Sequence, residues 1–352
     1  MATVRSMMLA WSLRLPRSLF SKAIPPTCRA EIRKTAVPIT CHGHSFVRQH
    51  CHGRIEAVPL AYTHYEPEDT ADTTLLPPII LLHCMFGSRS NWDAVSSAIA
   101  TATGRNVFAV DLRNHGDSPH TDDMDYPLMS ADLELFLRDR GFSKASFVGH
   151  SLGGRVAMKF AVTRPDAVER LVLEDVAPTY LPAVLREHWL PWQAKAMDTI
   201  MSLFSRDMSL EQARQMADRF LSSRITNRYV REFLLANLRE GHVTLEWRLN
   251  AKAIKQNIET LTALDYLDNQ SCDVDALFIG AADFICISAE CQEDIRQSFP
   301  NARIVSVKGT SHWVHNDKPE EFVVLVRDFM SACSSECFEG KEIRFENRGH
   351  GV

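Results

Sequence analysis

The chain has 352 residues, of which 45% are hydrophobic and 24% are charged, as in average soluble globular domains. No apolar run reaches the roughly 18 residues that a membrane-spanning helix needs, so we expect no transmembrane segment. The length fits one catalytic domain of about 270–300 residues with extensions at its ends.

Charge is distributed unevenly along the chain. Residues 1–35 hold seven lysines and arginines but a single acidic residue, Glu31, whereas the whole chain has a net charge of −5. A basic N-terminal segment on an otherwise acidic chain indicates a targeting segment rather than a nucleic-acid-binding surface. Because the first 22 residues are rich in Arg, Ser and Leu and contain no acid, residues 1–50 predict a mitochondrial transit peptide. The alternative is a disordered N-terminal segment with no targeting function.

The nine cysteines are odd in number and follow no regular spacing. Six histidines and cysteines gather between residues 41 and 52, but their spacing matches no standard zinc pattern. The sequence therefore predicts free thiols in a reducing compartment and no metal site.

Short apolar runs alternate with helical segments along most of the chain. The alternating segment at residues 55–65 predicts an antiparallel edge strand. Continuous apolar runs, typical of strands buried on both faces, occupy residues 79–82, 106–110, 145–148, 171–173, 276–279 and 303–307. Helical periodicity occupies residues 92–102, 130–140, 151–163 and 319–330. This alternation predicts an α/β fold with a mainly parallel central sheet and helices on both faces.

Residues 179–267 interrupt the alternation with several helical segments and no clear buried strand. Large apolar side chains recur there roughly every three or four residues, at Leu185, Trp189, Trp192, Met197 and Met201. Ordinary packing between two layers explains most of them. Ser209 and Gln212 have the spacing of a capping box, which opens a further helix. The interval predicts a helical cap inserted into the core.

The predicted organisation therefore has four parts. They are a leader at residues 1–50, a core formed by residues 55–178 and 268–330, a helical cap at residues 179–267, and a polar tail at residues 331–352.

The strongest chemical signal is Gly149-His150-Ser151-Leu152-Gly153, a G-x-S-x-G motif between an apolar run and a helical segment. A nucleophilic serine must lie on a sharp turn so that its hydroxyl projects above the sheet, and glycines on either side avoid clashes there. Ser151 is therefore the predicted nucleophile. The Leu152 amide, at the start of the helix, is a predicted oxyanion donor.

A second signal, His83-Cys84-Met85-Phe86-Gly87, follows the run at residues 79–82. Many hydrolases place the other oxyanion donor here, in a His-Gly-x-x-Gly loop. Met85 N–H is the predicted donor, and His83 belongs to the same predicted oxyanion and substrate-binding group. Cys84 stands where glycine is usual; its side chain would narrow the site, or tilt the loop if that position requires a positive φ.

The predicted general base is His312, which follows the last apolar run. Its place after the nucleophile fits the chain order nucleophile, acid, histidine. His315, three residues later, is interpreted as a surface or supporting residue. Two aspartates are candidates for the acid that orients the base: Asp175 follows the run at residues 171–173, and Asp283 follows the run at residues 276–279. The sequence does not choose between them.

The polar segment from Asp111 to Ser118 follows a further strand. A hydrogen-bonded loop that fixes the nucleophile turn is the favoured interpretation, and shaping of the site is the alternative.

Taken together, residues 83–87, 111–118, 149–154, 175–178 and 312–319 resemble the alpha/beta-hydrolase domain-containing protein 11 group, mitochondrial relatives of small bacterial acyl esterases. The resemblance covers roughly residues 55–330. Its most specific motif is Asp-x-Arg-Asn-His-Gly-Asp-Ser, here Asp111 to Ser118. Several relatives place the acid at the position of Asp175 and lack one at the position of Asp283; this chain has both.

The resemblance implies an α/β-hydrolase fold and an ester- or lipase-like hydrolase acting on glycerolipids such as diacylglycerol. It also implies residence in the mitochondrial matrix and association with 2-oxoacid dehydrogenase complexes, such as the 2-oxoglutarate dehydrogenase complex.

The leading hypothesis is a serine hydrolase that cleaves acyl esters through a Ser-His-Asp triad and an acyl-enzyme intermediate, without metal or organic cofactor. The alternative is a non-catalytic or weakly catalytic protein that protects a mitochondrial 2-oxoacid dehydrogenase complex, and Cys84 is the feature in its favour. Acyl transfer and carbon–carbon bond hydrolysis share the same triad and stay open.

Overall fold

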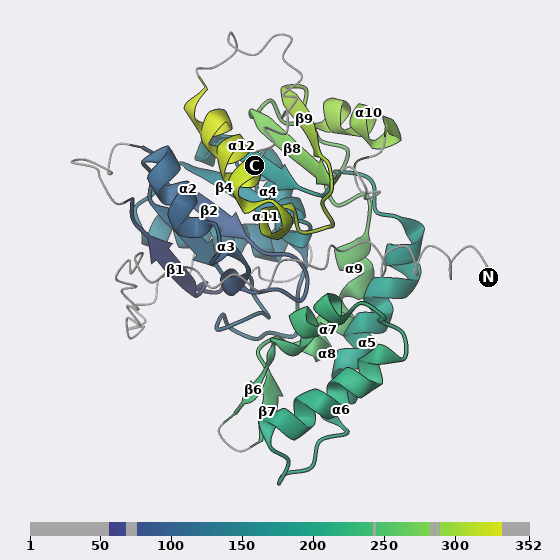
Figure 1. Ribbon diagram of the computed structural model, residues 1–352. Helices are drawn as coiled ribbons and strands as arrows, with labels where there is room; N and C mark the ends of the chain where they lie inside the picture. The colour runs from purple at the N-terminus through teal and green to yellow at the C-terminus, as the bar shows by residue number, and fades with distance from the viewer. Residues whose placement is uncertain (1–55, 68–75, 242–243, 282–286, 288, 333–352) are drawn as a thin grey trace, which may run out of the picture.

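The computed structural model describes residues 56–67, 76–241, 244–281, 287 and 289–332. A sheet of seven strands forms its centre, in the order β1-β3-β2-β4-β5-β8-β9 (Figure 1). The strands are β1 (Tyr62–Tyr65), β2 (Ile79–Leu82), β3 (Val107–Val110), β4 (Ala145–His150), β5 (Val168–Glu174), β8 (Ala276–Ala281) and β9 (Ala302–Val307). Only β1 pairs antiparallel, and it does so with β3 at one edge of this sheet.

Helices cover both faces of the sheet, as the alternating pattern predicts. The core helices are α2 (Ser96–Thr103), α3 (Tyr126–Asp139), α4 (Leu152–Thr163), α10 (Ala289–Ser298), α11 (Val314–Asp317) and α12 (Pro319–Ser331). Short turns of helix also form at η1 (Arg89–Trp92) and η2 (Pro165–Ala167).

Strand β2 shows why the apolar runs are continuous. Ile80 and Leu82 point into one hydrophobic cluster, which α3 and α4 complete. Ile79 and Leu81 point into a second cluster on the other face, which α2 and α12 complete. Because successive side chains of a strand point to opposite faces, a strand covered on both sides needs apolar residues throughout.

Between β5 and β8 the chain forms a separate layer of helices. They are η3 (Leu185–Trp189), α5 (Leu190–Met201), α6 (Leu210–Ser222), α7 (Arg228–Leu235), α8 (Ala251–Gln256) and α9 (Ile258–Thr262). Two short strands, β6 (Leu238–Glu240) and β7 (Leu245–Trp247), pair antiparallel within this layer. Figure 1 shows α5 to α8 grouped below the sheet. We call the segment from η3 to α9 the cap.

Several predicted boundaries differ from the observed ones. Helix α3 begins at Tyr126 rather than at residue 130, because the Asp125 side chain caps it by accepting a hydrogen bond from Leu128 N at 2.7 Å. Strand β1 is limited to Tyr62–Tyr65, shorter than the predicted segment. The Ser209 capping box is present, and the Ser209 hydroxyl accepts from Gln212 N at 3.3 Å.

Some predictions concern residues outside the described part of the chain. They are the leader at residues 1–50, the histidine and cysteine cluster at residues 41–52, the candidate acid Asp283, and nearly all of the tail at residues 331–352. Among the described residues, no helix has both the length and the apolar character that a membrane span requires.

Candidate active site

The carboxyl ends of the parallel strands bring the candidate residues to one edge of the sheet. His83 directly follows β2, Ser151 follows β4 and Asp175 follows β5. The register pairs His150 with Glu174, so Ser151 and Asp175 leave two adjacent strands at the same level. Sites of open α/β folds form at this edge of the sheet, beyond the strand ends.

Ser151 lies on a strained turn. Its backbone has φ 52° and ψ −112°, a conformation that residues other than glycine rarely adopt. The Ser151 amide donates to the Glu174 carbonyl at 3.1 Å, which fixes the turn against β5. A Cβ at Gly149 would lie 2.6 Å from Gly154, and one at Gly153 would lie 2.3 Å from the Leu82 carbonyl oxygen. The two motif glycines therefore allow the tight approach of strand, turn and helix.

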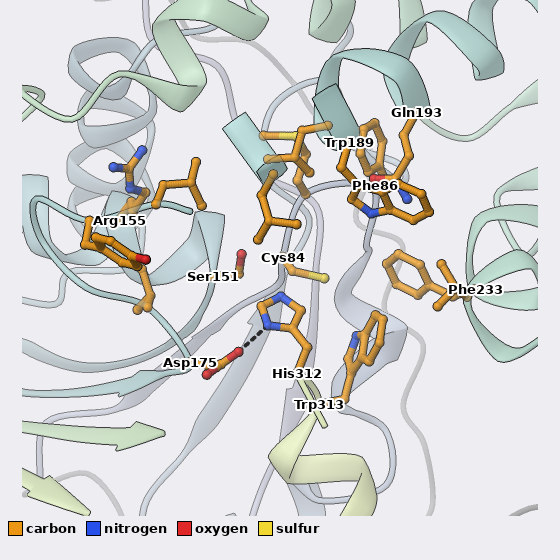
Figure 2. Close-up of a pocket in the computed structure, with 17 residues that line it drawn as sticks. Cys84, Phe86, Ser151, Arg155, Asp175, Trp189, Gln193, Phe233, His312 and Trp313 are labelled. Carbon is orange, nitrogen blue, oxygen red and sulfur yellow. Dashed lines mark hydrogen bonds and ion pairs between the residues drawn. The ribbon is translucent and has the colours of Figure 1, made fainter. Parts of the chain in front are cut away.

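His312 and Asp175 form a direct pair. The His312 Nδ1 and Asp175 Oδ2 atoms are 2.5 Å apart (Figure 2). The Asp175 side chain is fully buried, and its Oδ1 also accepts a hydrogen bond from Ala281 N at 3.4 Å. Burial raises the pKa of the Asp175 carboxyl, and the contact with His312 partly offsets that rise. A carboxylate on Nδ1 leaves Nε2 as the imidazole nitrogen available for proton transfer.

The segment Cys84–Gly87 forms a turn beside Ser151. Gly87 N donates to the Cys84 carbonyl at 3.0 Å, which closes the turn around Met85 and Phe86. Among the described residues, neither the Met85 amide nor the Leu152 amide donates a hydrogen bond to a protein acceptor. Met85 and Ser151 line the same cavity and Leu152 directly follows Ser151, so the two N–H groups are candidates for oxyanion donors beside the hydroxyl.

His83 supports this turn and does not line the cavity. Its side chain is fully buried, its Nδ1 donates to the Cys84 carbonyl at 2.8 Å, and its Nε2 accepts from Leu112 N at 3.0 Å. Burial lowers the pKa of the His83 imidazole to about 4, so the ring is neutral. With both ring nitrogens engaged, His83 is better assigned to positioning the turn than to contacting substrate.

Cys84 narrows the site without tilting the turn. Its side chain is buried and lines the cavity. The residue with a positive φ in this turn is Phe86, at 64°, rather than Cys84. Burial raises the pKa of the Cys84 thiol to about 12, which keeps it in the neutral form. The structure therefore does not require a glycine backbone at this position.

Glu174 and His315 form a second pair, which the sequence did not predict; of the two interpretations of His315, the surface position is wrong and the supporting role fits. Both the backbone N–H and the ring Nδ1 of His315 approach Glu174, at 3.0 Å and 2.7 Å. Glu174 and His315 are both fully buried. Since Glu174 precedes Asp175 and His315 follows His312, this pair holds the strand end and the histidine loop together. A charged residue at the end of a buried strand was the signal available in the sequence.

The same cluster includes His150, whose ring centroid is 5.3 Å from that of His315. Donor atoms of His150, Glu174 and His315 lie within 4.8 Å of one another, a spacing that a metal ion can bridge. Glu174 already accepts from His315, however, and all three side chains are sealed from solvent. The arrangement fits a hydrogen-bonded support for the histidine loop better than a metal site.

The Asp111–Ser118 loop is held by its own hydrogen bonds. Buried Asp111 accepts from the Arg89 side chain, from Arg89 N at 2.6 Å and from Asp117 N at 2.9 Å. His115 of this loop is buried, and its ring centroid lies 4.9 Å from that of His83. The loop therefore braces the turn that carries Met85, and none of its residues lines the cavity.

The cavity above Ser151 lies between the core and the cap. Its volume is about 80 Å³, and core residues Ser151, Asp175 and His312 all line it (Figure 2). The cap contributes mostly apolar side chains, namely Leu185, Trp189, Leu190, Val230 and Phe233. The Phe233 ring packs on Trp313, beside His312, at a centroid distance of 5.5 Å. A cavity with apolar side chains on one side and polar groups on the other can hold the acyl part of an ester.

Known proteins resemble this chain along most of its length. A family profile described as alpha/beta hydrolase fold matches residues 77–319. The Xenopus laevis protein "sn-1-specific diacylglycerol lipase ABHD11" is 37% identical over 276 residues, covering 78% of this chain and 85% of that protein. The Mus musculus protein of the same name is 34% identical over 327 residues, covering 92% of this chain and 100% of its own.

The chain belongs to the ABHD11 group of the alpha/beta-hydrolase family. More distant members agree with this placement. Escherichia coli "Esterase YbfF" is 29% identical over 255 residues, covering 72% of this chain and 93% of its own. The solved structure "Marine microorganism esterase" superposes with a TM-score of 0.63 at 29% identity, covering 78% of this chain and 100% of its own.

Membership in this family confirms the predicted fold class and places the chain among hydrolases of the esterase and lipase type. The region matched by the family profile begins just before β2 and contains Ser151, Asp175 and His312. The structure brings these three residues to one cavity. Asp283 lies outside the described residues, so the structure gives it no position.

Proposed function

We propose that this enzyme hydrolyses carboxylic acyl esters through an acyl-enzyme intermediate, with Ser151 as nucleophile, His312 as general base and Asp175 as the acid that orients it. The observation that supports it most is the 2.5 Å contact between His312 and Asp175 at the cavity that Ser151 lines. A buried carboxylate on Nδ1 fixes the tautomer in which Nε2 can accept a proton, and it stabilises the imidazolium that then forms.

The reaction proceeds in two halves. Ser151 Oγ attacks the ester carbonyl while His312 Nε2 takes the hydroxyl proton, and the same imidazolium then protonates the departing alkoxide. The acyl group remains on Ser151. Water, deprotonated by His312, attacks the acyl-enzyme carbon, and the proton returns to Ser151 as the carboxylic acid leaves.

The oxyanion of each tetrahedral intermediate binds the Met85 and Leu152 amides. Both lack a protein acceptor among the described residues, and Leu152 is the first residue of α4, where the helix dipole favours negative charge. Preorganised donors of this kind are each worth about 10²–10³ in rate. They stabilise charge that is absent from the substrate, so they act on kcat.

The cavity and the relatives support a proposal for the substrate class. Relatives of the ABHD11 group are named as diacylglycerol lipases. We propose lipid-like acyl esters, including diacylglycerol, for this enzyme. The cavity of about 80 Å³ is smaller than the engineered cavity of about 150 Å³ that binds benzene. The enclosed volume therefore fits short acyl groups, and a long acyl chain must extend beyond it.

The cell compartment and the protein partner are separate proposals. We propose the mitochondrial matrix from the basic segment at residues 1–50, and association with a 2-oxoglutarate dehydrogenase complex from the family resemblance. Fusion of residues 1–50 to a fluorescent reporter tests the first proposal, and a diffuse cytosolic signal contradicts it. Co-purification with the complex, by the wild-type and Ser151→Ala chains alike, tests the second and separates it from catalysis.

The central experiment combines covalent labelling with an ester series. We expect a fluorophosphonate probe to label the wild-type chain and not the Ser151→Ala chain. We expect that substitution to lower kcat by about 10⁵-fold or more, as for other triad nucleophiles. Esters of rising acyl length then define the preference. A folded chain that takes no label and cleaves no ester in the series contradicts the proposed function and favours the non-catalytic alternative.

A further inference from the structure

One cap side chain reaches the turn that carries the Met85 amide. Asn237 lies between α7 and β6, and its Nδ2 donates to the Phe86 carbonyl at 2.8 Å and to the Leu234 carbonyl at 3.3 Å. The side chain is buried. Its own backbone is fixed to the cap, because Arg248 N donates to the Asn237 carbonyl at 2.7 Å. A cap residue whose backbone is hydrogen-bonded within the cap thus contacts a core residue 151 positions away in the chain.

The residue that Asn237 holds is conformationally strained. Phe86 has φ 64°, and it is the third residue of the turn that the Gly87 N to Cys84 carbonyl bond closes. Glycine or asparagine normally takes a positive φ at this position of a turn, because a larger side chain crowds its own backbone there. A phenylalanine stays in this conformation only when its surroundings hold it.

The strained peptide connects directly to the oxyanion donor. The Phe86 carbonyl and the Gly87 N–H belong to the same peptide plane, so holding the carbonyl also aims the N–H at the Cys84 carbonyl. The Cys84 carbonyl in turn shares its plane with the Met85 N–H. It accepts from Gly87 N at 3.0 Å and from His83 Nδ1 at 2.8 Å. If Phe86 relaxes, the first of these two restraints on the Met85 amide is lost.

We propose that Asn237 is a positioning residue, through which the cap fixes the Met85 amide in the orientation that binds the oxyanion. The inference rests on the proposed function, since it needs the Met85 amide to be a donor in the reaction. It adds that the cap contributes to the chemical step as well as to substrate selection. A hydrogen bond that only fastened the cap to the core would affect stability and substrate entry instead.

The chain offers a matched control for that distinction. Asn257, also in the cap, donates from Nδ2 to the core carbonyl of Asp122 at 2.9 Å and to the helix carbonyl of Ala253 at 2.9 Å. It therefore donates to one core and one cap carbonyl, as Asn237 does; its bond to the core is exposed, and Asp122 neither belongs to the Cys84–Gly87 turn nor lines the cavity. Losing either asparagine removes one bond between cap and core.

The test compares Asn237→Asp and Asn237→Leu with Asn257→Asp and Asn257→Leu in the full chain. The aspartate keeps the shape of the side chain and replaces the donor with an acceptor, so it serves even if the leucine variant does not fold. For each variant, kcat and KM are measured with a short acyl ester, together with Tm. Inhibition by a trifluoromethyl ketone of the same acyl group reports the oxyanion site, because its adduct with Ser151 carries that charge.

We expect the Asn237 variants to lose about 10–100-fold in kcat, less than the full loss of one donor, with KM changed less than about 2-fold. The inhibitor should weaken by the same factor, and the Asn257 variants should keep both values within about 2-fold. Equal effects at the two asparagines, or a change confined to KM and Tm, would overturn the inference. If Ser151→Ala leaves turnover intact, the proposed function itself fails, which is a different result.

Discussion

The cavity has one wall from the core and one wall from the cap, and the side chains of the two walls make different kinds of contact. The core wall carries the polar pair of His312 with Asp175, and the buried pair of His315 with Glu174 supports it from outside the cavity. The cap wall is mostly apolar and touches the cavity through side chains such as Trp189 and Phe233. Directional bonds fix atoms to fractions of an ångström, whereas apolar contacts tolerate exchange of one side chain for another. Under the proposed function, the reacting side chains therefore come from the core wall, and the cap wall mainly selects the substrate.

Hydrogen bonds and ion pairs connect the cap to the core. Asn237 holds Phe86, and Asn250 N donates to the Asn114 carbonyl at 2.8 Å. Asp117 also forms ion pairs with Arg239 and Arg248 of the cap, at 3.0 Å and 3.4 Å. These contacts lie around β6, β7 and α8, on the side of the cap that faces the Asp111–Ser118 loop.

The largest effect that separates the two walls is expected at Asp175. Asp175→Asn keeps the size of the side chain but favours the wrong imidazole tautomer, so we expect kcat to fall by about 10⁴-fold with little change in KM. Steady-state kinetics with a short acyl ester measures it. Asp283→Asn is the matched control and should stay within a few-fold of wild type. If the loss occurs at Asp283 instead, the assignment of the acid is wrong.

A smaller effect is expected on the cap wall. Phe233→Ala widens the cavity next to Trp313, and we expect the ratio of kcat/KM for longer over shorter acyl esters to rise about 10-fold. Phe220→Ala removes a similar, partly buried cap ring that does not line the cavity. It should lower Tm without changing this ratio. A large fall in kcat for every ester in Phe233→Ala would contradict the division between the walls.

The smallest effect concerns pH, and it arises from histidines of the core. Burial lowers the pKa of His83 to about 4 and that of His115 to about 3, both below the ordinary 6.5. Between pH 6.5 and 4 the unfolded chain binds protons at these positions and the folded chain does not, so acidification lowers the free energy of unfolding. Each histidine contributes a slope of up to about 1.4 kcal/mol per pH unit.

Urea unfolding of the wild-type chain and of His115→Gln, at pH 7, 6 and 5, measures that slope. The variant should show a shallower loss of stability on acidification, whereas His120→Gln, at an exposed position of the same region, should behave like wild type. If the free energy of unfolding falls equally with pH in wild type and His115→Gln, folding does not lower the pKa of His115, and the prediction is wrong.

The sequence predicted the parts of the site that local pattern determines. Ser151 was identifiable because strand, turn and helix are consecutive in the chain, and the region of Met85 because it follows a buried strand. The sequence could not choose between Asp175 and Asp283, because both follow apolar runs; the structure places Asp175 in contact with His312 and does not describe Asp283. Asn237 and the Glu174–His315 pair were missed for a related reason: their partners lie more than a hundred residues away.

The elements that the sequence did not predict, or placed wrongly, also lack a clear local pattern. Strands β6 and β7 have three residues each, too few for an alternating pattern to be visible. Helix α10 contains mostly polar residues and was not predicted at all. Helix α3 starts at a cap formed by Asp125, which precedes the apolar periodicity on which the prediction depended.

The pairing of β4 with β5 has a consequence for the lengths of both strands. His150 pairs with Glu174, so Ser151 and Asp175 each lie one residue beyond the same pair of residues. Adding or deleting one residue within β5 would turn the Asp175 side chain toward the opposite face of the sheet, away from His312. Strands β4 and β5 must therefore keep their lengths if Asp175 is to stay in contact with His312.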